Sequence, residues 1–224
     1  MRRRYTILET VKPVHQEFGQ LARKWRADAS KLMLGWIWAG YDLLAAEILS
    51  SVNWDLAEDD LERELTELLE IRIRRSMPSE TFCYIRHEAK ERERRKPAPA
   101  QPPEYDLAYV LYSNERIMWP MEAKVLKSDQ QVIHYANDIR NEFLTCRYAP
   151  FSAEGAMLGY MLSGQPGKAF SEIAKKLRVK LKRHPDFPDR DHRVSSHRRK
   201  VSGSKVYPSN FLCHHLLMVL QYDK

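Results

Sequence analysis

The chain has 224 residues, a hydrophobic content of 43% and a formal net charge of +7. This length and composition suit one domain, or one domain with a helical extension, and supply enough apolar residues for a buried core. Cys83, Cys146 and Cys213 are scattered and form no CxxC spacing, which argues against a disulfide framework and for a reducing compartment. No apolar segment of a secretory signal follows the basic N-terminus, and the most apolar window contains Asp42 and Glu47. We therefore expect a cytoplasmic protein without a membrane span.

The positive charge is unevenly distributed. Residues 168–205 contain 13 Lys and Arg against 4 Asp and Glu, a local charge of +9, which leaves −2 for the rest of the chain. A concentrated basic segment indicates a polyanionic partner, with nucleic acid as the first candidate. A solvated basic surface without a partner is the alternative.

The N-terminal third of the chain has helical periodicity. Apolar residues between positions 14 and 52 recur at helical spacing, and Gly35 is expected to separate two helices. Trp36 and Trp38 make the second helix unusually aromatic, which favours core packing or a subunit interface. We expect residues 1–55 to form a helical extension that serves packing, a homodimer or a partner protein.

A further helix is predicted from about Ala57 to Ser76, with acidic residues in its first turn as the helix dipole prefers. Glu64 lies at the edge of its apolar stripe and Glu67 lies nearly opposite the stripe's centre. A strand is expected at residues 81–87, followed by a solvated helix end that begins at Glu88 and by a proline-rich loop at residues 97–103.

The central feature is a predicted hairpin. Two apolar runs, Asp106–Tyr112 and Arg116–Val125, flank the turn residues Ser113 and Asn114. Pro120 interrupts the second run, which predicts that this strand lies at a sheet edge or is kinked.

The pattern after the hairpin alternates helices with strands. A helix with its N-cap at Ser128 or Asp129 is expected, and the remaining predictions are a strand at 156–162, a basic helix at 168–182, a loop-like stretch at 184–204 and a strand at 211–220. This order predicts an α/β domain over residues 56–224, with a central mixed sheet flanked by helices.

The hairpin also carries the residues best suited to chemistry. The strand period of two places Glu122 and Lys124 on one face of the second strand, and Asp106 begins the first strand. Two carboxylates from neighbouring strands suit Mg²⁺, and the Ala123 carbonyl offers a further ligand. A lysine beside them can orient or deprotonate a water, or stabilise developing negative charge.

At these residues the chain resembles the PD-(D/E)xK nuclease superfamily, over roughly residues 58–165. The resemblance implies the restriction-endonuclease-like fold, with Asp106 and Glu122 as metal ligands, Lys124 assisting the attacking water and Glu64 supporting the site, Glu67 being the other candidate for this helix acid. The literal Pro-Asp pair of that family is absent, since Pro103 stands three residues before Asp106.

The resemblance implies a Mg²⁺-dependent nuclease, with Mn²⁺ as a substitute, that acts on DNA in genome defence or repair. The alternative is a catalytically inactive relative that binds nucleic acid or serves as an assembly subunit. Gln131 and Tyr135 match the spacing of the QxxxY element of exonuclease-type members, although Tyr135 also fits the apolar face of its helix.

Two further groups of residues have side chains suited to binding. Phosphate contacts without sequence reading are expected from Arg190, Arg193, His197, Arg198, Arg199 and Lys200. The histidines between positions 184 and 215 invite a zinc interpretation, but no cysteine stands at zinc-site spacing and His184–His197 belong to the loop-like stretch. The sequence therefore argues against a zinc site.

Overall fold

The computed structural model describes residues 27–47, 52–91, 102–201, 203, 205 and 207–220. Its elements are α3 (Ala27–Glu47), α4 (Glu58–Ser76), β1 (Cys83–Lys90), β2 (Glu104–Leu111), β3 (Met118–Leu126), α5 (Ile133–Asp138), the π-helix η1 (Ile139–Phe143), β4 (Glu154–Met161), α6 (Pro166–Leu177), β5 (Lys182–Arg183), β6 (His192–Arg198) and β7 (Asn210–Val219).

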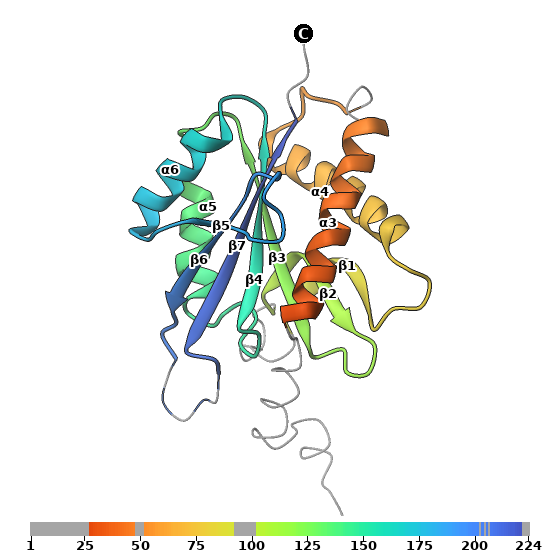
Figure 1. The fold of residues 1–224 in the computed structure, drawn as a ribbon, viewed down its shortest axis with the longest axis vertical. Helices are drawn as coiled ribbons and strands as arrows, with labels where there is room; N and C mark the ends of the chain where they lie inside the picture. Colours follow the sequence, from red (N-terminus) through yellow and green to blue (C-terminus); the bar gives the residue numbers. More distant parts are fainter. Residues whose placement is uncertain are drawn as a thin grey trace, which may run out of the picture.

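The strands form one seven-stranded mixed sheet in the order β1-β2-β3-β4-β7-β6-β5. β4 pairs in parallel with β3 on one side and with β7 on the other, and the remaining pairs are antiparallel. Helices α3 and α4 cover one face, and α5 and α6 cover the other (Figure 1). The expected α/β class with a central mixed sheet is confirmed.

Each face of the sheet has its own apolar core. Met33, Leu65 and Leu69 pack with one set of strand side chains beneath α3 and α4. Tyr135 and Phe170 pack with the opposite set beneath α5 and α6. Because strand side chains alternate between faces, this division decides on which side each functional residue lies.

Helix α3 is continuous through Gly35, where the sequence predicted a break. Gly40, one turn and a half further on, is the glycine that matters. A Cβ there would lie 2.8 Å from the backbone nitrogen of Ile73, so the absence of a side chain permits the close approach of α3 and α4. Helix α3 therefore packs against α4 as part of the domain core.

Other local predictions need correction. Residues 88–90 continue strand β1 instead of starting a helix end, and His192–Arg198 form strand β6 instead of a loop. The helix after the hairpin begins only at Ile133, and Asp129 instead accepts a hydrogen bond from the backbone of Gln165. The proline-rich stretch 97–101 and residues 1–26 lie outside the described residues.

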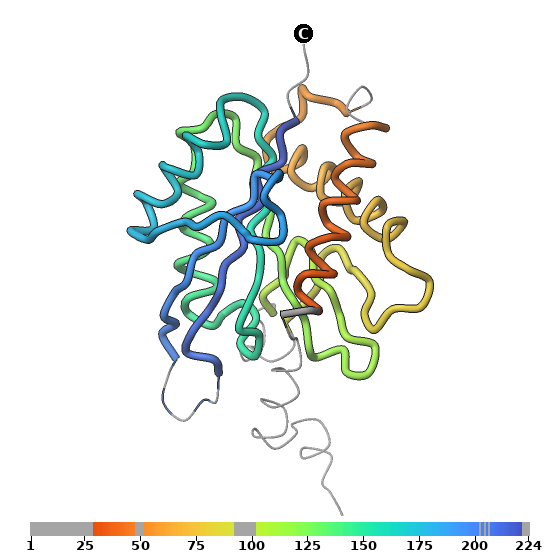
Figure 2. The backbone as a smooth tube through the Cα atoms, viewed as in Figure 1, coloured from red at the N-terminus to blue at the C-terminus, as the bar shows by residue number. Residues whose placement is uncertain are grey.

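The predicted hairpin of β2 and β3 is confirmed, but β3 is an interior strand and not an edge. Pro120 pairs with Ala108 of β2, and the pairing of β3 with β4 starts one residue later, at Met121. The missing N–H of Pro120 is tolerated because no β4 partner is paired at that position. The backbone tube in Figure 2 follows β3 through the middle of the molecule.

Candidate active site at the end of strand β3

The hairpin strands separate where the site begins. The last pair between β2 and β3 is Leu107↔Met121, whereas β3 continues to Leu126 against β4 alone. The backbone groups on the open side of β3 are bound by two carboxylates. Ala123 N donates to Asp106 Oδ2 at 2.7 Å, and Val125 N donates to Glu62 Oε2 at 3.0 Å. Side-chain acids thus replace the missing neighbouring strand.

Lys124 lies at the centre of an acidic cluster. Its Nζ is 2.8 Å from Glu62 Oε1, 3.5 Å from Asp138 Oδ2 and 3.7 Å from Glu122 Oε1. With Asp106, four carboxylates from α4, β2, β3 and α5 surround one ammonium group. We call Glu62, Asp106, Glu122, Lys124 and Asp138 the acidic cluster.

Most of these groups are shielded from water. Glu122 is only 8% exposed. Among the residues that the structure describes, its Oε2 has no hydrogen-bond partner. Burial raises the pKa of Glu122 well above its ordinary value, and the nearby Asp106 carboxylate raises it further. An unpaired buried carboxylate oxygen is costly unless a cation or a proton neutralises it.

The other members of the cluster respond to the same forces. Burial also raises the pKa of Asp106 and of Glu62, against the opposing effect of Lys124. Burial disfavours the charge on Lys124, but Glu122, Glu62 and Asp106 outweigh it and raise the lysine pKa. Lys124 is therefore a firmly protonated cation, whereas the carboxylates compete for too little positive charge.

The helix acid in this cluster is Glu62. Glu64, the residue that the sequence favoured, is half-buried on α4, and Glu67 is exposed. Glu62 lies four residues before the buried Thr66, whose hydroxyl contacts Tyr160 of β4 at 3.1 Å, so this face of α4 meets the sheet. Glu62 and Thr66 are four residues apart and so lie on one face of α4, but the apolar stripe drew attention to Glu64 instead.

Asp138 was also missed. It ends α5 and directly precedes the π-helix η1, where the sequence predicted one uninterrupted α-helix. Single π-turns occur frequently at functional sites, because they change the direction of neighbouring side chains. No local pattern in the sequence marks this change of helix type.

The two residues of the QxxxY spacing, Gln131 and Tyr135, lie in different environments. Tyr135 is fully buried, and its hydroxyl contacts Met157 O at 3.2 Å and His215 Nδ1 at 3.1 Å, so it belongs to the core. Gln131 is exposed and lines a cavity of about 410 Å³ that also borders Lys124. Lys127 and Lys176 line the same cavity, together with Glu58, which pairs with Lys127 at 2.9 Å.

The residues predicted to bind phosphate differ in their exposure to solvent and in their existing contacts. Arg199 is buried and donates to the carbonyl oxygens of Ala149, Ser152 and Tyr148, which corrects its expected place on the surface. Arg190 forms a two-pronged ion pair with Asp42.

The other members of that set lie on or near strand β6. Arg193 stacks over Phe170 at 5.3 Å from the ring centroid, and His197 Nε2 lies 2.6 Å from Ser195 Oγ. Arg198 and Lys200 are exposed. These two residues keep the expected orientation toward solvent.

No protein-family model, curated protein or solved structure matches this chain. Within the described parts of the chain, every helix is too short or too polar to cross a lipid bilayer.

Proposed function

We propose that the protein is a divalent-metal-dependent nuclease acting on DNA, with the acidic cluster as its active site. The observation that carries the proposal is the crowding of the buried carboxyl groups of Glu122 and Asp106 beside the cation Lys124, with no described donor bonded to Glu122 Oε2. The arrangement has more buried negative charge than Lys124 alone can neutralise. Such an excess fits a site that binds a cation.

The donor set suits Mg²⁺ or Mn²⁺. Both ions prefer oxygen ligands, and Mg²⁺ binds through one or two protein carboxylates while keeping several waters. Asp106 and Glu122 supply the carboxylates. Because the N–H and C=O of a strand residue point to the same side, the Ala123 carbonyl faces the side on which its N–H meets Asp106. When bound, the ion would supply charge neutralisation and an activated water.

Lys124 contributes charge rather than a base. Its raised pKa keeps it protonated at neutral pH, so it can hold a water or stabilise negative charge on a phosphate but cannot accept a proton. The Lys124 ammonium group donates to Glu62 Oε1 at 2.8 Å, and this contact positions it. Glu62 also anchors the backbone of Val125, which ties the lysine to the strand that carries Glu122.

The surroundings suit a polyanionic substrate. Lys176, which belongs to the basic segment 168–205, lines the cavity beside Lys124, and so does Lys127, which is paired with Glu58. Phosphates would be attracted to these side chains without any reading of base sequence. The proposal therefore includes weak sequence preference and strong dependence on salt.

The test is a cleavage assay on single- and double-stranded DNA and RNA with Mg²⁺ or Mn²⁺. We expect wild-type cleavage of DNA, and no detectable cleavage by Asp106→Asn or Lys124→Ala with unchanged circular dichroism. Glu67→Gln, an exposed change on the same helix as Glu62, serves as the matched control. Failure of the wild type to cut any substrate would instead support the inactive nuclease-fold relative.

A further inference from the structure

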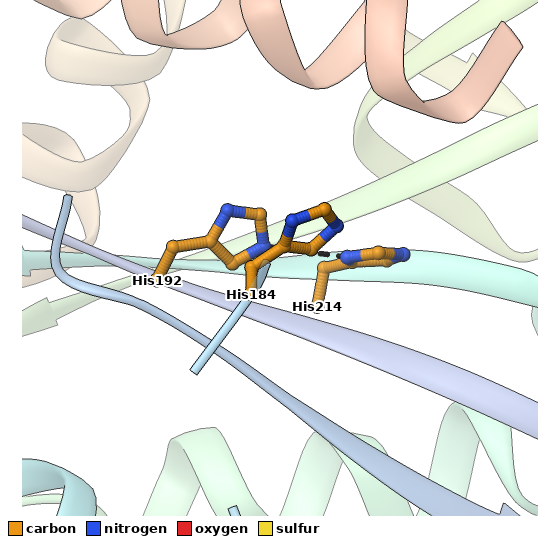
Figure 3. A group of neighbouring side chains, drawn as sticks. All are labelled: His184, His192 and His214. Atoms are coloured by element: carbon orange, nitrogen blue, oxygen red, sulfur yellow. Dashed lines mark hydrogen bonds between the residues drawn. The ribbon is translucent and has the colours of Figure 1, made fainter. Parts of the chain in front are cut away.

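A second group of buried titratable residues lies at the other end of the sheet. His184 follows β5, His192 begins β6 and His214 lies on β7, and one nitrogen from each is within 4.8 Å of the others. We call them the histidine cluster. Figure 3 shows the three rings gathered above the strands on the side that α3 covers. The cluster shares no residue with the acidic cluster.

We propose that the histidine cluster is a transition-metal site, best suited to Zn²⁺. His192 Nε2 and His214 Nδ1 face each other at 3.3 Å. Two nitrogens bound to one tetrahedral zinc at about 2.0–2.1 Å stand roughly 3.3 Å apart, so this pair already has the required spacing. Imidazole nitrogens are ligands that zinc and its neighbours in the first transition row prefer.

His184 supplies the third ligand. Its ring stacks on that of His192 with 4.5 Å between centroids, and its side chain is 9% exposed, whereas His192 and His214 are 1% and 2% exposed. His184 thus borders the solvent and gives an ion its route of entry. Three protein ligands leave one coordination position for water, as in zinc sites that act on substrates.

The surroundings of His214 are those of a supported metal ligand. Its Nε2 lies 3.6 Å from Glu154 Oε2, and Ser30 Oγ donates to that same oxygen at 2.5 Å. A carboxylate behind the far nitrogen of a ligating histidine holds the proton there and leaves the near nitrogen free for the metal. This order assigns Nδ1 of His214 to the ion and makes Glu154 a positioning residue.

Two of the three imidazoles, those of His184 and His192, favour the neutral form that metal binding requires. Burial lowers the pKa of His192 to about 2 and also lowers that of His184. Lys31 lies near, but it is paired with Asp186 at 2.7 Å. The Glu154 carboxylate lies beside the cluster at His214, and the Asp186 carboxylate acts on His184 from the other side.

Metal binding changes two contacts. In the metal-free protein Trp38 Nε1 donates to His192 Nδ1 at 3.3 Å, and the backbone N of Asp186 donates to His184 Nδ1 at 3.2 Å. Coordination through Nε2 moves the ring proton to Nδ1, so both contacts must be released. They are at the long end of the hydrogen-bond range and are readily given up. Trp38 consequently reports on metal entry.

The experiment uses the full chain after treatment with a chelator. Zn²⁺ is titrated by calorimetry, and Co²⁺ is titrated while the visible absorption of its four-coordinate complex is recorded. We expect one equivalent to bind at micromolar affinity or tighter, with a change in tryptophan fluorescence. Trp38→Phe should reduce the fluorescence change and retain binding.

The variants separate ligands from supports. His184→Asn and His192→Asn should each weaken Zn²⁺ binding at least about 100-fold, and Glu154→Gln by about 10- to 100-fold. His134→Asn, on α5 at the opposite face, is the matched control and should bind as the wild type does. Thermal melts establish that each variant is folded. His184 is the least buried of the three histidines, so His184→Asn is the variant least expected to misfold.

The result that overturns the proposal is a folded wild type that binds neither ion at micromolar concentration, or that binds equally well without His184 and His192. Binding that disappears in Glu122→Gln and persists in the histidine variants would place the ion in the acidic cluster instead. The histidine cluster would then be a hydrogen-bonded network without a metal.

Discussion

The two ends of the sheet bury charge-bearing groups of opposite kind. In the acidic cluster burial raises the pKa of Asp106 and of Glu122, whereas in the histidine cluster burial lowers the pKa of His184 and of His192. Burial favours the neutral form in both places. The consequences differ, because a neutral carboxyl group must lose its proton to bind a hard cation, whereas a neutral imidazole is already a ligand.

The two clusters also differ in the neighbours of their buried polar atoms. In the histidine cluster the rings, Trp38, Glu154 and Ser30 contact one another at up to 3.6 Å. In the acidic cluster one oxygen of Glu122 is buried without a hydrogen bond among the described residues. His214 Nε2 also lacks a hydrogen bond among the described residues, but it faces the Glu154 carboxylate, whereas Glu122 Oε2 lies among other carboxylates. Three changes test this difference.

The largest effect is expected from Glu62. Glu62→Gln removes the charge that holds Lys124 at 2.8 Å, so we expect DNA cleavage to fall about 10- to 100-fold. Glu64→Gln is the matched control, because Glu64 lies on the same helix two residues further on and, among the described residues, forms no ion pair with the acidic cluster. Initial cleavage rates at saturating Mg²⁺ measure both. Equal losses in the two variants would show that Glu62 is not the positioning acid.

The second effect is the response of the histidines to acid. The folded-state pKa of His192 is about 2 and that of His215 is about 3, both below the ordinary 6.5, so the unfolded chain binds more protons below pH 6.5. The free energy of unfolding should therefore fall by about 1.4 kcal/mol per pH unit for each histidine as the pH drops below that value. Urea titrations of the metal-free protein between pH 4.5 and 7 measure this slope.

The matched variant is His192→Asn, which should remove one histidine's share of the slope and leave that of His215. An unchanged slope would show that His192 is protonated in the folded protein.

The smallest effect is expected from Glu122 and has the opposite sign. Its folded-state pKa is raised above the ordinary 4.5, so the unfolded chain loses the proton first and stability falls as the pH rises from 4.5 toward the folded value. Glu122→Gln removes this loss. We expect the metal-free variant to be about 1 kcal/mol more stable than the wild type at pH 7 and to lose this advantage near pH 4.

Saturating Mg²⁺ should reverse the order, since only the wild type gains stability from the ion. Chemical denaturation with and without Mg²⁺ provides the comparison. A variant that is less stable than the wild type without metal at pH 7 would contradict the view that Glu122 is an uncompensated charge.

The sequence predicted the parts of this molecule that local pattern controls. The apolar runs around Ser113 and Asn114 were enough for the hairpin, and the period of two placed Glu122 and Lys124 on one face. The α/β class followed from the alternation of helices and strands. These features depend on neighbours within a few residues.

What the sequence could not predict depends on tertiary contacts. Glu62 became part of the acidic cluster because α4 packs across β3, and Asp138 because the helix changes to a π-turn. The strand at His192–Arg198 looked like a loop because its residues are polar, yet they pair with His214 and its neighbours on β7. The sequence argued against a zinc site because no cysteine stands at zinc-site spacing and because His184–His197 looked like a loop; only the second reason is changed by the structure.

The most direct test of the central claim is a calorimetric titration of the chelator-treated protein with Mg²⁺ at neutral pH. The account predicts binding by the wild type and by His192→Asn, loss of binding in Glu122→Gln and in Asp106→Asn, and DNA cleavage that follows the same order. Mg²⁺ binding that is unchanged in Glu122→Gln, or is absent from the folded wild type, would contradict it.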